Sequence, residues 1–306
     1  MKRKRGPLKR LIRRRRRDLV VHLVIAAYRL VRVLPRCAGL RIFSGLGAIA
    51  SLVLRKDFDR TCTHLGMVYG DGMTPAGIRS MARGVFAGAG RNLFDAVKIL
   101  HNQDYWFDRL VSSDVNSAFE RDCRKGGGVL VATAHLGCFE LLFPYVARKG
   151  YRAMAVGQRL FDPRIDDIVR AVRSGTNREY FSRSDSPLAL VRRWRNGGVL
   201  GVLLDQDTRV EGVFAPFLGR LAFTPSGLVR LAVRFRIPIY VMTTARQKDE
   251  KHHIFIEGPV ESGQTQDEAG AVVETVEAIN DCLSGKIREF PLQWVWMHRR
   301  WKSRPR

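Results

Sequence analysis

From Gly126 onward, short apolar runs bounded by glycine alternate with stretches of helical spacing, and this alternation constrains the fold more than any other feature. The apolar runs are "GVLVATA", "YRAMAVG", "GVLGVLLD", "IPIYVMTT" and "HHIFIEG". The helical stretches that follow or separate them are Phe139–Lys149, Pro163–Ser174, Pro225–Phe235 and Gln266–Ser284. Strands that alternate with helices build βαβ units and a parallel sheet covered on both faces. We therefore expect an α/β fold with a largely parallel central sheet flanked by helices.

The first hundred residues have a different pattern, which is mostly helical. Gly39–Leu54 is an apolar helix by composition, and Thr74–Leu100 is an amphipathic one with Thr74 as N-cap and Pro75 in the first turn. The expected organisation is a disordered basic tail (1–17), a helical N-terminal region (18–100) and an α/β core (101–306). No repeat or linker separates the last two, so we expect them to form one domain.

The charge is strongly basic and unevenly distributed. The chain has 53 Lys and Arg against 29 Asp and Glu, a net charge of +24. Residues 1–17 hold 11 of the basic residues and no acid, so the remaining chain carries +13, which is 24 less 11. Such a chain should attract nucleic acid, anionic lipid or an acidic protein, and charge alone does not choose among them.

The segment after the tail, "LVVHLVIAAYRLVRVLP", favours anionic lipid. On a helix, its polar residues and Asp18 fall within an arc of about 80°, and the rest of the surface is apolar. A mostly apolar helix with a basic edge is typical of a helix lying in a membrane interface, and each basic residue near an anionic surface adds about 1 kcal/mol. An ordinary core helix after a solvated tail, or a cleaved twin-arginine export signal, would be the alternatives.

No membrane-spanning helix is expected, because the longest run without Asp, Glu, Lys or Arg is the 14 residues Gly126–Phe139, and a span needs about 18–20. The five cysteines show no C-x-x-C spacing, which indicates reduced thiols and neither a disulfide framework nor a zinc site. They are Cys37, Cys62, Cys123, Cys138 and Cys282. We expect no metal and no cofactor.

The chemistry is indicated at the end of the first apolar run, where "AHLGCFE" places His135 five residues before Glu140. A strand ending at His135, followed by a turn through Gly137, would put both side chains at the carboxyl edge of the sheet, where α/β folds bind ligands. A histidine there can take a proton from a hydroxyl, while a carboxylate on its other ring nitrogen fixes the tautomer. The alternative is a structural histidine whose hydrogen bonds are satisfied.

Three segments give the chain a wider resemblance: the one around His135, the stretch "LLDQDTRVEGVFAPFLGRLAFTPSGLVRLAVRFRIPI" and the C-terminal "FPLQWVWMHRRWKSRP". From Leu19 to Pro305 the chain resembles the bacterial lipid A biosynthesis acyltransferase family, the late acyltransferases of the lysophospholipid acyltransferase superfamily. The resemblance implies His135 as general base and Glu140 as its orienting partner. It also implies a fatty acyl thioester as donor, on acyl carrier protein or CoA. The acceptor would be a lipid A precursor or related glycolipid, on the cytoplasmic face of the bacterial inner membrane.

The same resemblance suggests substrate-binding residues, although surface charge, loop capping and core packing are alternatives for them. Arginines would hold the sugar phosphate, and these are Arg159, Arg173 and Arg183. Asp205 and Gln206 would form the floor of the site or bind the acceptor. Phe217, Gly219 and Arg220 would line the acyl or headgroup pocket. Trp294, Trp296 and Trp301 would line the acyl channel or lie at the headgroup level.

The chain also departs from the family pattern. Cys138 and Phe139 stand where an asparagine and an aromatic residue are common, His64 replaces an asparagine, and Leu292 replaces a glutamate. These changes leave the proposed base intact but admit another glycolipid as acceptor. A phospholipid or phosphatidylinositol mannoside acyltransferase stays open as an alternative. So does a nucleic-acid-binding protein without enzyme activity, although no nucleic-acid-binding module is recognisable.

Overall fold

The computed structural model describes residues 7–157, 162–173, 175–182, 185–261, 263, 265 and 267–305. At its centre is a seven-stranded sheet with the order β1-β9-β8-β2-β5-β3-β4. The strands are β1 (Val111–Ser113), β2 (Val129–Thr133), β3 (Arg152–Gly157), β4 (Arg178–Ser182), β5 (Gly198–Leu203), β8 (Ile239–Arg246) and β9 (His252–Val260). Within the sheet β9 runs antiparallel to β8, and every other pair of neighbours is parallel. The expected α/β fold with a largely parallel sheet is confirmed.

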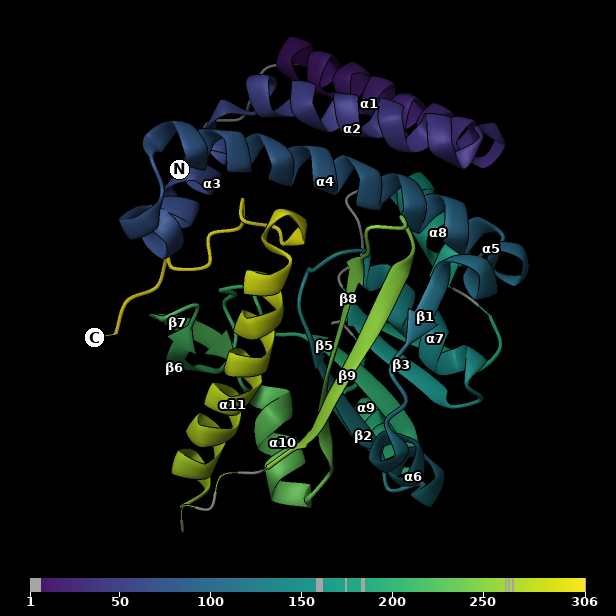
Figure 1. Ribbon diagram of the computed structural model, residues 1–306. Coiled ribbons are helices and arrows are strands. Elements are labelled where there is room, and N and C mark those ends of the chain that lie inside the picture. The colour runs from purple at the N-terminus through teal and green to yellow at the C-terminus, as the bar shows by residue number, and fades with distance from the viewer. Residues whose placement is uncertain are drawn as a thin grey trace.

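Six helices accompany the strands of the core (Figure 1). They are α6 (Ser117–Lys125), α7 (Leu142–Arg148), α8 (Pro163–Arg173), α9 (Pro187–Arg195), α10 (Gly227–Phe235) and α11 (Glu268–Glu289). The apolar stripe of α11 is fully buried, and it consists of Val272, Val276, Ile279 and Leu283. A helix with one apolar stripe can bury it against the rest of the core while its polar face stays in water.

A two-stranded antiparallel sheet was not foreseen from the sequence. It pairs β6 (Gly212–Phe217) with β7 (Arg220–Pro225). The connecting residues Leu218 and Gly219 both have positive φ, 52° and 81°. Positive φ at both central positions is the requirement of the tight turn that suits the twist of a hairpin.

The first part of the chain forms a helical layer over one end of the core (Figure 1). Its elements are α1 (Pro7–Val33), α2 (Arg36–Val53), α3 (Arg55–Tyr69), the 3₁₀ turn η1 (Gly70–Gly72), α4 (Pro75–His101) and α5 (Gln103–Leu110). Thr74 caps α4 as expected, accepting a hydrogen bond from the Gly77 backbone N–H at 3.2 Å. Residues 7–17 are helical and belong to α1, whereas a disordered tail was expected there. Arginine, lysine and leucine, which are frequent in this segment, are good helix formers.

The two longest apolar helices of this layer, α2 and α4, pack backbone to backbone. A Cβ on Gly47 would lie 2.2 Å from the Phe86 carbonyl oxygen, and one on Gly90 would lie 2.1 Å from the Phe43 carbonyl oxygen. Such close approach needs glycine on both helices. The opposite face of α2 is uncovered and apolar, and its residues include Ile42, Leu46, Ile49, Leu52 and Val53.

Among the described residues, α2 is the one helix long and apolar enough to cross a membrane by length and composition. No such helix was expected from the sequence, because Arg36 and Arg41 shorten the uncharged run in this segment. Length and composition alone do not distinguish a spanning helix from one that lies in the interface.

A buried charge cluster joins the helical layer to the sheet. The fully buried Asp95 on α4 accepts hydrogen bonds from Arg36 on α2 at 2.6 and 2.9 Å. It also binds Arg246 of β8 at 2.5 Å and His252 of β9 at 2.9 Å. Burial alone would raise the pKa of Asp95, but His252 and the two guanidinium groups lower it well below its usual range. Asp95 therefore holds α2, α4 and the β8–β9 hairpin together as an anion.

Candidate active site

His135 lies just beyond the carboxyl end of β2, in a turn that only glycine permits. Gly137 has a φ of +58°, and a Cβ on it would lie 2.1 Å from the Thr244 carbonyl oxygen. Its backbone N–H donates to the Gln293 carbonyl oxygen at 3.0 Å. The turn is thus fixed from both sides, by β8 and by the C-terminal segment, and this fixes the backbone of the motif.

The carboxylate that holds the imidazole belongs to Asp205. His135 Nδ1 lies 2.8 Å from Asp205 Oδ1, and Asp205 Oδ2 accepts from the His135 backbone N–H at 2.8 Å. Trp294 Nε1 donates to the same Oδ2, also at 2.8 Å. Asp205 follows β5, the neighbour of β2 in the sheet, so adjacent strand ends bring the two residues together. The expectation that Glu140 is the orienting partner is therefore corrected, because its carboxylate binds elsewhere.

Glu140 forms an ion pair with an arginine across the site. It lies in the 3₁₀ turn η2 (Phe139–Leu141), and its oxygens accept from Arg173 on α8 at 2.6 and 3.2 Å. Arg173 also donates to the Tyr180 hydroxyl at 3.1 Å. The ring of Phe139, the residue before Glu140, lies 4.8 Å from the His135 ring by centroids. Glu140 acts on His135 through its charge and not through a hydrogen bond.

The electrostatics favour a basic imidazole. Burial alone would lower the pKa of His135, but the charge and hydrogen bond of Asp205, followed by the charge of Glu140, raise it above its usual value. Burial would raise the pKa of Asp205, yet its contacts with His135 and Trp294 lower it well below the usual range. At neutral pH the pair therefore contains an ionised aspartate, and a proton that His135 takes up is stabilised.

Two further polar side chains complete the surroundings of the imidazole. Gln206 Nε2 lies 3.0 Å from His135 Nε2 and 3.3 Å from His298 Nε2. The rings of His135 and His298 meet edge to face, with centroids 5.0 Å apart. Burial and the neighbouring His135 lower the pKa of His298 to about 4, so it is neutral at physiological pH. The cluster holds two histidines, but only one of them is paired with a carboxylate.

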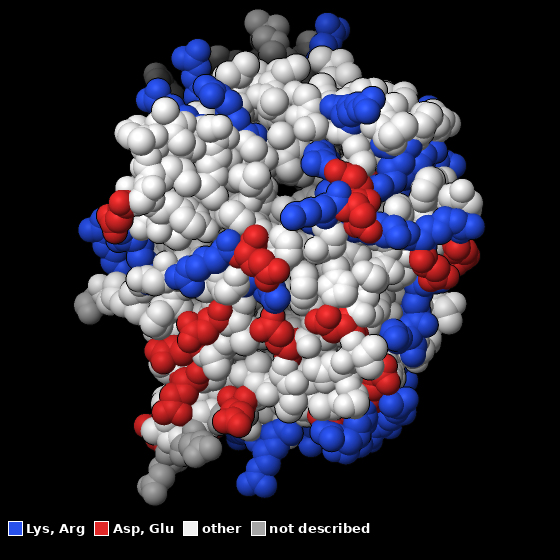
Figure 2. All heavy atoms as spheres, in the orientation of Figure 1, with Lys and Arg blue, Asp and Glu red and all other residues white. Residues whose placement is uncertain are grey.

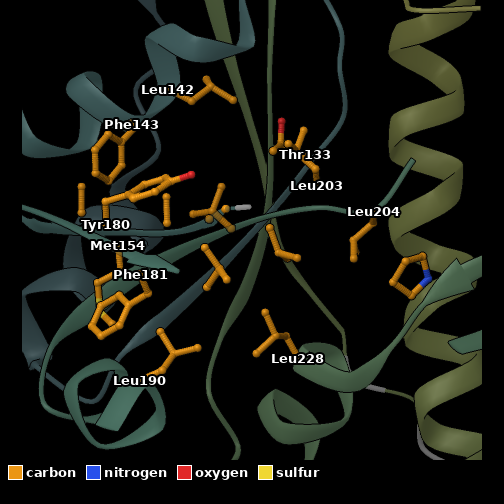
Figure 3. A pocket seen from close by; sticks show the side chains of 18 of the residues that line it. Thr133, Leu142, Phe143, Met154, Tyr180, Phe181, Leu190, Leu203, Leu204 and Leu228 are labelled. Atoms are coloured by element: carbon orange, nitrogen blue, oxygen red, sulfur yellow. The ribbon is translucent and has the colours of Figure 1, made fainter. Parts of the chain in front are cut away.

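A cavity of about 700 Å³ opens beside His135 and Glu140. Its walls come from β2, β3, β4 and β5 together with α7, α9 and α10, and most of its lining is apolar. Figure 3 shows the apolar side chains around it, among them Leu142, Phe143, Met154, Phe181, Leu190, Leu203, Leu204 and Leu228. A volume of this size is within the usual range of about 300–1,000 Å³ for ligand pockets. The site thus joins an acid–base group to a space that suits a hydrocarbon chain.

The structure brings four of the predicted site residues to this cavity, namely His135, Glu140, Arg173 and Gln206. Asp205 lies behind His135 and is fully buried. Arg159 and Arg183 lie outside the described residues.

The hairpin residues are placed differently from the expectation, since none of them lines the described wall of the cavity. Phe217 is buried in the core, with its ring 5.5 Å from that of Trp294 by centroids and the Arg300 guanidinium over it. Arg220 donates to the Met67 carbonyl oxygen at 2.8 Å on the outside of the hairpin. Gly219 lies in the tight turn between β6 and β7, where it adopts a positive φ. Phe217 is thus taken up by the core, whereas Gly219 and Arg220 lie at the exposed turn of the hairpin.

The C-terminal tryptophans belong to the core and not to the cavity wall. Trp294 and Trp296 are almost completely buried, and Trp301 packs against the same core cluster. Trp294 nevertheless acts on the site through its hydrogen bond to Asp205. That bond and the position of His298 beside Gln206 were missed from the sequence, because no spacing within the C-terminal segment indicates which loop the segment will contact.

Cys138 cannot act as a nucleophile in this arrangement. The side chain is buried, and burial raises the pKa of its thiol well above the usual value. A thiolate would be required for attack on an acyl group. Among the described residues, no group of His, Cys, Asp and Glu could hold a metal ion. In the described site, His135 with its carboxylate partner is a group that can transfer a proton.

A histidine paired with a buried carboxylate beside an apolar cavity suits acyl transfer to an alcohol, and comparison with known families decides the class. The family model described as bacterial lipid A biosynthesis acyltransferase matches residues 9–303. The chain belongs to this family. It is accordingly an acyltransferase of lipid A biosynthesis, and proteins of this family are in general associated with membranes. A search among curated proteins finds none that matches the chain.

In this acyltransferase, the variant Glu140→Gln tests whether Glu140 acts on His135 only through its charge, while Asp205 orients the ring. Loss of the Glu140 charge should lower the pKa of His135, so the acid limb of the pH–rate profile should move to lower pH. The plateau rate should fall by only about fivefold, the effect of about 1 kcal/mol for a partly exposed ion pair. Steady-state rates between pH 5 and 9 would measure both. Loss of all activity at every pH would show that Glu140 has a direct role.

Proposed function

We propose that this acyltransferase moves a fatty acyl chain from a thioester, on acyl carrier protein or CoA, to a hydroxyl of a lipid A precursor or related glycolipid. His135 is the general base. The observation that carries the proposal is the imidazole held through Nδ1 by the buried Asp205, at the edge of an apolar cavity of about 700 Å³. This arrangement leaves Nε2 for the substrate hydroxyl, while the cavity offers the acyl chain a place out of water.

The reaction follows from these groups. His135 Nε2 takes the proton of the acceptor hydroxyl as its oxygen attacks the thioester carbonyl carbon, and a C–O bond forms while the carbonyl oxygen becomes an oxyanion. Collapse of this tetrahedral intermediate breaks the C–S bond, and the leaving thiolate takes the proton back from the imidazolium. The products are an ester and a free thiol, and His135 returns to its neutral form.

The phosphate of the acceptor would be held by arginines near the cavity. Arg173 lies there, but its ion pair with Glu140 already compensates its charge. We therefore assign Arg173 chiefly to fixing Glu140 and the edge of the cavity. On the resemblance in sequence, phosphate binding is assigned to Arg159 first, with Arg183 behind it.

The helical layer is the proposed membrane-binding surface, on the cytoplasmic face of the inner membrane. Between Leu19 and Lys56 the chain contains basic residues and no acid, and the uncovered face of α2 is apolar. Figure 2 shows white and blue side chains over this end, whereas the red ones gather lower, including along α11. An apolar face with a basic margin suits an anionic bilayer surface.

Replacing Leu46 and Ile49 together by serine should separate membrane binding from catalysis. Both side chains are more than half exposed, so stability should change little, but affinity for anionic liposomes should fall about tenfold or more through lost apolar burial. Liposome sedimentation would measure the affinity, and turnover on detergent-dispersed substrate should persist. Serine at Leu188 and Val115, which are exposed elsewhere on the core, is the matched control. Equal effects of the two double variants would contradict the assignment of this surface.

The function itself is tested by incubating the purified protein with an acyl-carrier-protein thioester and a lipid A precursor. Mass spectrometry should detect the precursor with one added acyl chain, and an equal amount of free thiol should appear. Acylation of a phospholipid in preference to the glycolipid would instead assign the acceptor to the wider superfamily. Absence of acyl transfer, with salt-dependent binding to duplex DNA and none to liposomes, would favour the nucleic-acid-binding alternative.

A further inference from the structure

The amide of Gln206 has an unusual position against the general base. Its Nε2 atom lies 3.0 Å from His135 Nε2 and 3.2 Å from His135 Nδ1. Near-equal distances to both ring nitrogens place the amide nitrogen over the face of the ring, and not in line with the lone pair of either nitrogen. Since Nδ1 is bound to Asp205, the lone pair of Nε2 stays available for a hydroxyl. An N–H donor therefore lies next to the reacting atoms without blocking the base.

His298 explains how the amide is held with its nitrogen toward the site. It lies 3.3 Å from Gln206 Nε2 through its own Nε2 atom. A neutral imidazole has one nitrogen that accepts, whereas a protonated one has none. His298 Nε2 can thus accept one of the two amide hydrogens, and the second hydrogen is left for the substrate.

Three backbone donors of the motif turn already have partners. The Gly137 N–H donates to the Gln293 carbonyl oxygen, and the Leu141 N–H donates to the Cys138 carbonyl oxygen. The His135 N–H donates to Asp205. Arg173, the cation at the cavity, is paired with Glu140. These groups have partners in the described structure, so none is free to receive a developing negative charge without breaking a contact.

We propose that the Gln206 carboxamide stabilises the oxyanion of the tetrahedral intermediate, and that His298 positions it. This inference rests on the proposed function. When the acceptor oxygen attacks, the electron pair of the carbonyl bond moves onto oxygen, and the amide N–H hydrogen-bonds to that charge. When the C–S bond breaks, the pair returns to the carbonyl and the amide is released. A donor fixed before the reaction stabilises this charge without reorganisation of its own.

The test compares Gln206→Ala with the unchanged enzyme, using the acyl-carrier thioester and the glycolipid acceptor. The loss of one oxyanion donor should lower kcat by about 10²–10³-fold and leave both KM values within about threefold. The acid limb of the pH–rate profile, which reports His135, should keep its position. Gln247→Ala, on the loop after β8 and away from the cavity, is the control of the same residue type. A shifted acid limb, or a higher KM with unchanged kcat, would overturn the proposal.

A second pair of variants tests the positioning role of His298. His298→Ala should lower kcat, and His298→Gln should restore part of the loss, because a glutamine oxygen can accept from the Gln206 amide. A phosphonate analogue of the tetrahedral intermediate adds a readout by binding. Its affinity should fall in Gln206→Ala by about the factor seen in kcat/KM, and unchanged affinity would overturn the proposal.

The activities of Gln206→Ala and His135→Ala separate the oxyanion assignment from the proposed function. If Gln206→Ala retains full activity while His135→Ala does not, only the oxyanion assignment is wrong. If His135→Ala also retains full activity, or the unchanged protein transfers no acyl group, the proposed function is wrong. Circular dichroism and thermal unfolding of each variant would establish that a loss of activity comes from the site.

Discussion

Asp205→Asn should lower kcat by about 10³–10⁴-fold while the protein stays folded. Asp205 Oδ2 accepts two N–H groups, from the His135 backbone and from Trp294, and Oδ1 faces His135 Nδ1. In asparagine the single oxygen would keep the two donors, so the NH₂ group would turn toward Nδ1. His135 would then accept at Nδ1 and carry its proton on Nε2, which is the nitrogen that must take a proton in the reaction.

Steady-state kinetics would measure this loss, and nitrogen NMR of the histidines would show the change of tautomer. Asp122→Asn is a suitable control, because Asp122 is also a buried aspartate but binds Tyr240 at 2.8 Å, away from the cavity. Its rate should stay close to that of the unchanged enzyme. A rate for Asp205→Asn within tenfold of the unchanged enzyme would contradict the assignment of Asp205 as the orienting partner.

The second large effect concerns stability. Asp95→Asn should lower the free energy of unfolding by about 3–5 kcal/mol, since Arg36, Arg246 and His252 would lose their common anion inside the protein. Urea or guanidinium unfolding would measure it. Asp57→Asn breaks a partly exposed pair with Arg60 and should cost at most about 1 kcal/mol. Equal losses in the two variants would show that the cluster does not hold the layers together.

The pH dependence of stability should have the same origin. Because the pKa of Asp95 is lowered in the folded protein, its contribution is complete above its ordinary value of about 3.9 and is lost as the pH falls toward the lowered value. In Asp95→Asn this part of the acid destabilisation should be missing. An unchanged dependence of unfolding on pH below 4 would indicate that other carboxylates dominate.

The architecture follows from the sequence to a large extent because it depends on local patterns. The runs that became β2, β3, β5, β8 and β9 are short and mostly apolar, several of them next to a glycine, and the stripe of α11 has regular helical spacing. The short β1 and β4 were missed. Val111–Ser113 is too short to show alternation, and Arg178–Ser182 is a polar edge strand. The β6–β7 hairpin was missed because Pro216 and Pro225 interrupt its apolar pattern.

The site could be predicted only in part, for a physical reason. The place of His135 depends on its own strand and turn, which are local. Its partner depends on which strand lies beside β2, and this is decided by the packing of the whole sheet. Sequence spacing therefore favoured the nearby Glu140, whereas the structure pairs His135 with Asp205, 70 residues further along the chain. The position of His298 depends in the same way on the docking of the C-terminal segment.

His135, held by Asp205, is the group proposed to remove the proton from the acceptor hydroxyl. The most direct measurement is the rate of acyl transfer by purified His135→Ala, with its fold checked by circular dichroism. We expect a loss of about 10²–10⁴-fold in kcat, the usual contribution of a general base, with the thioester still bound. Transfer at the rate of the unchanged enzyme would contradict it.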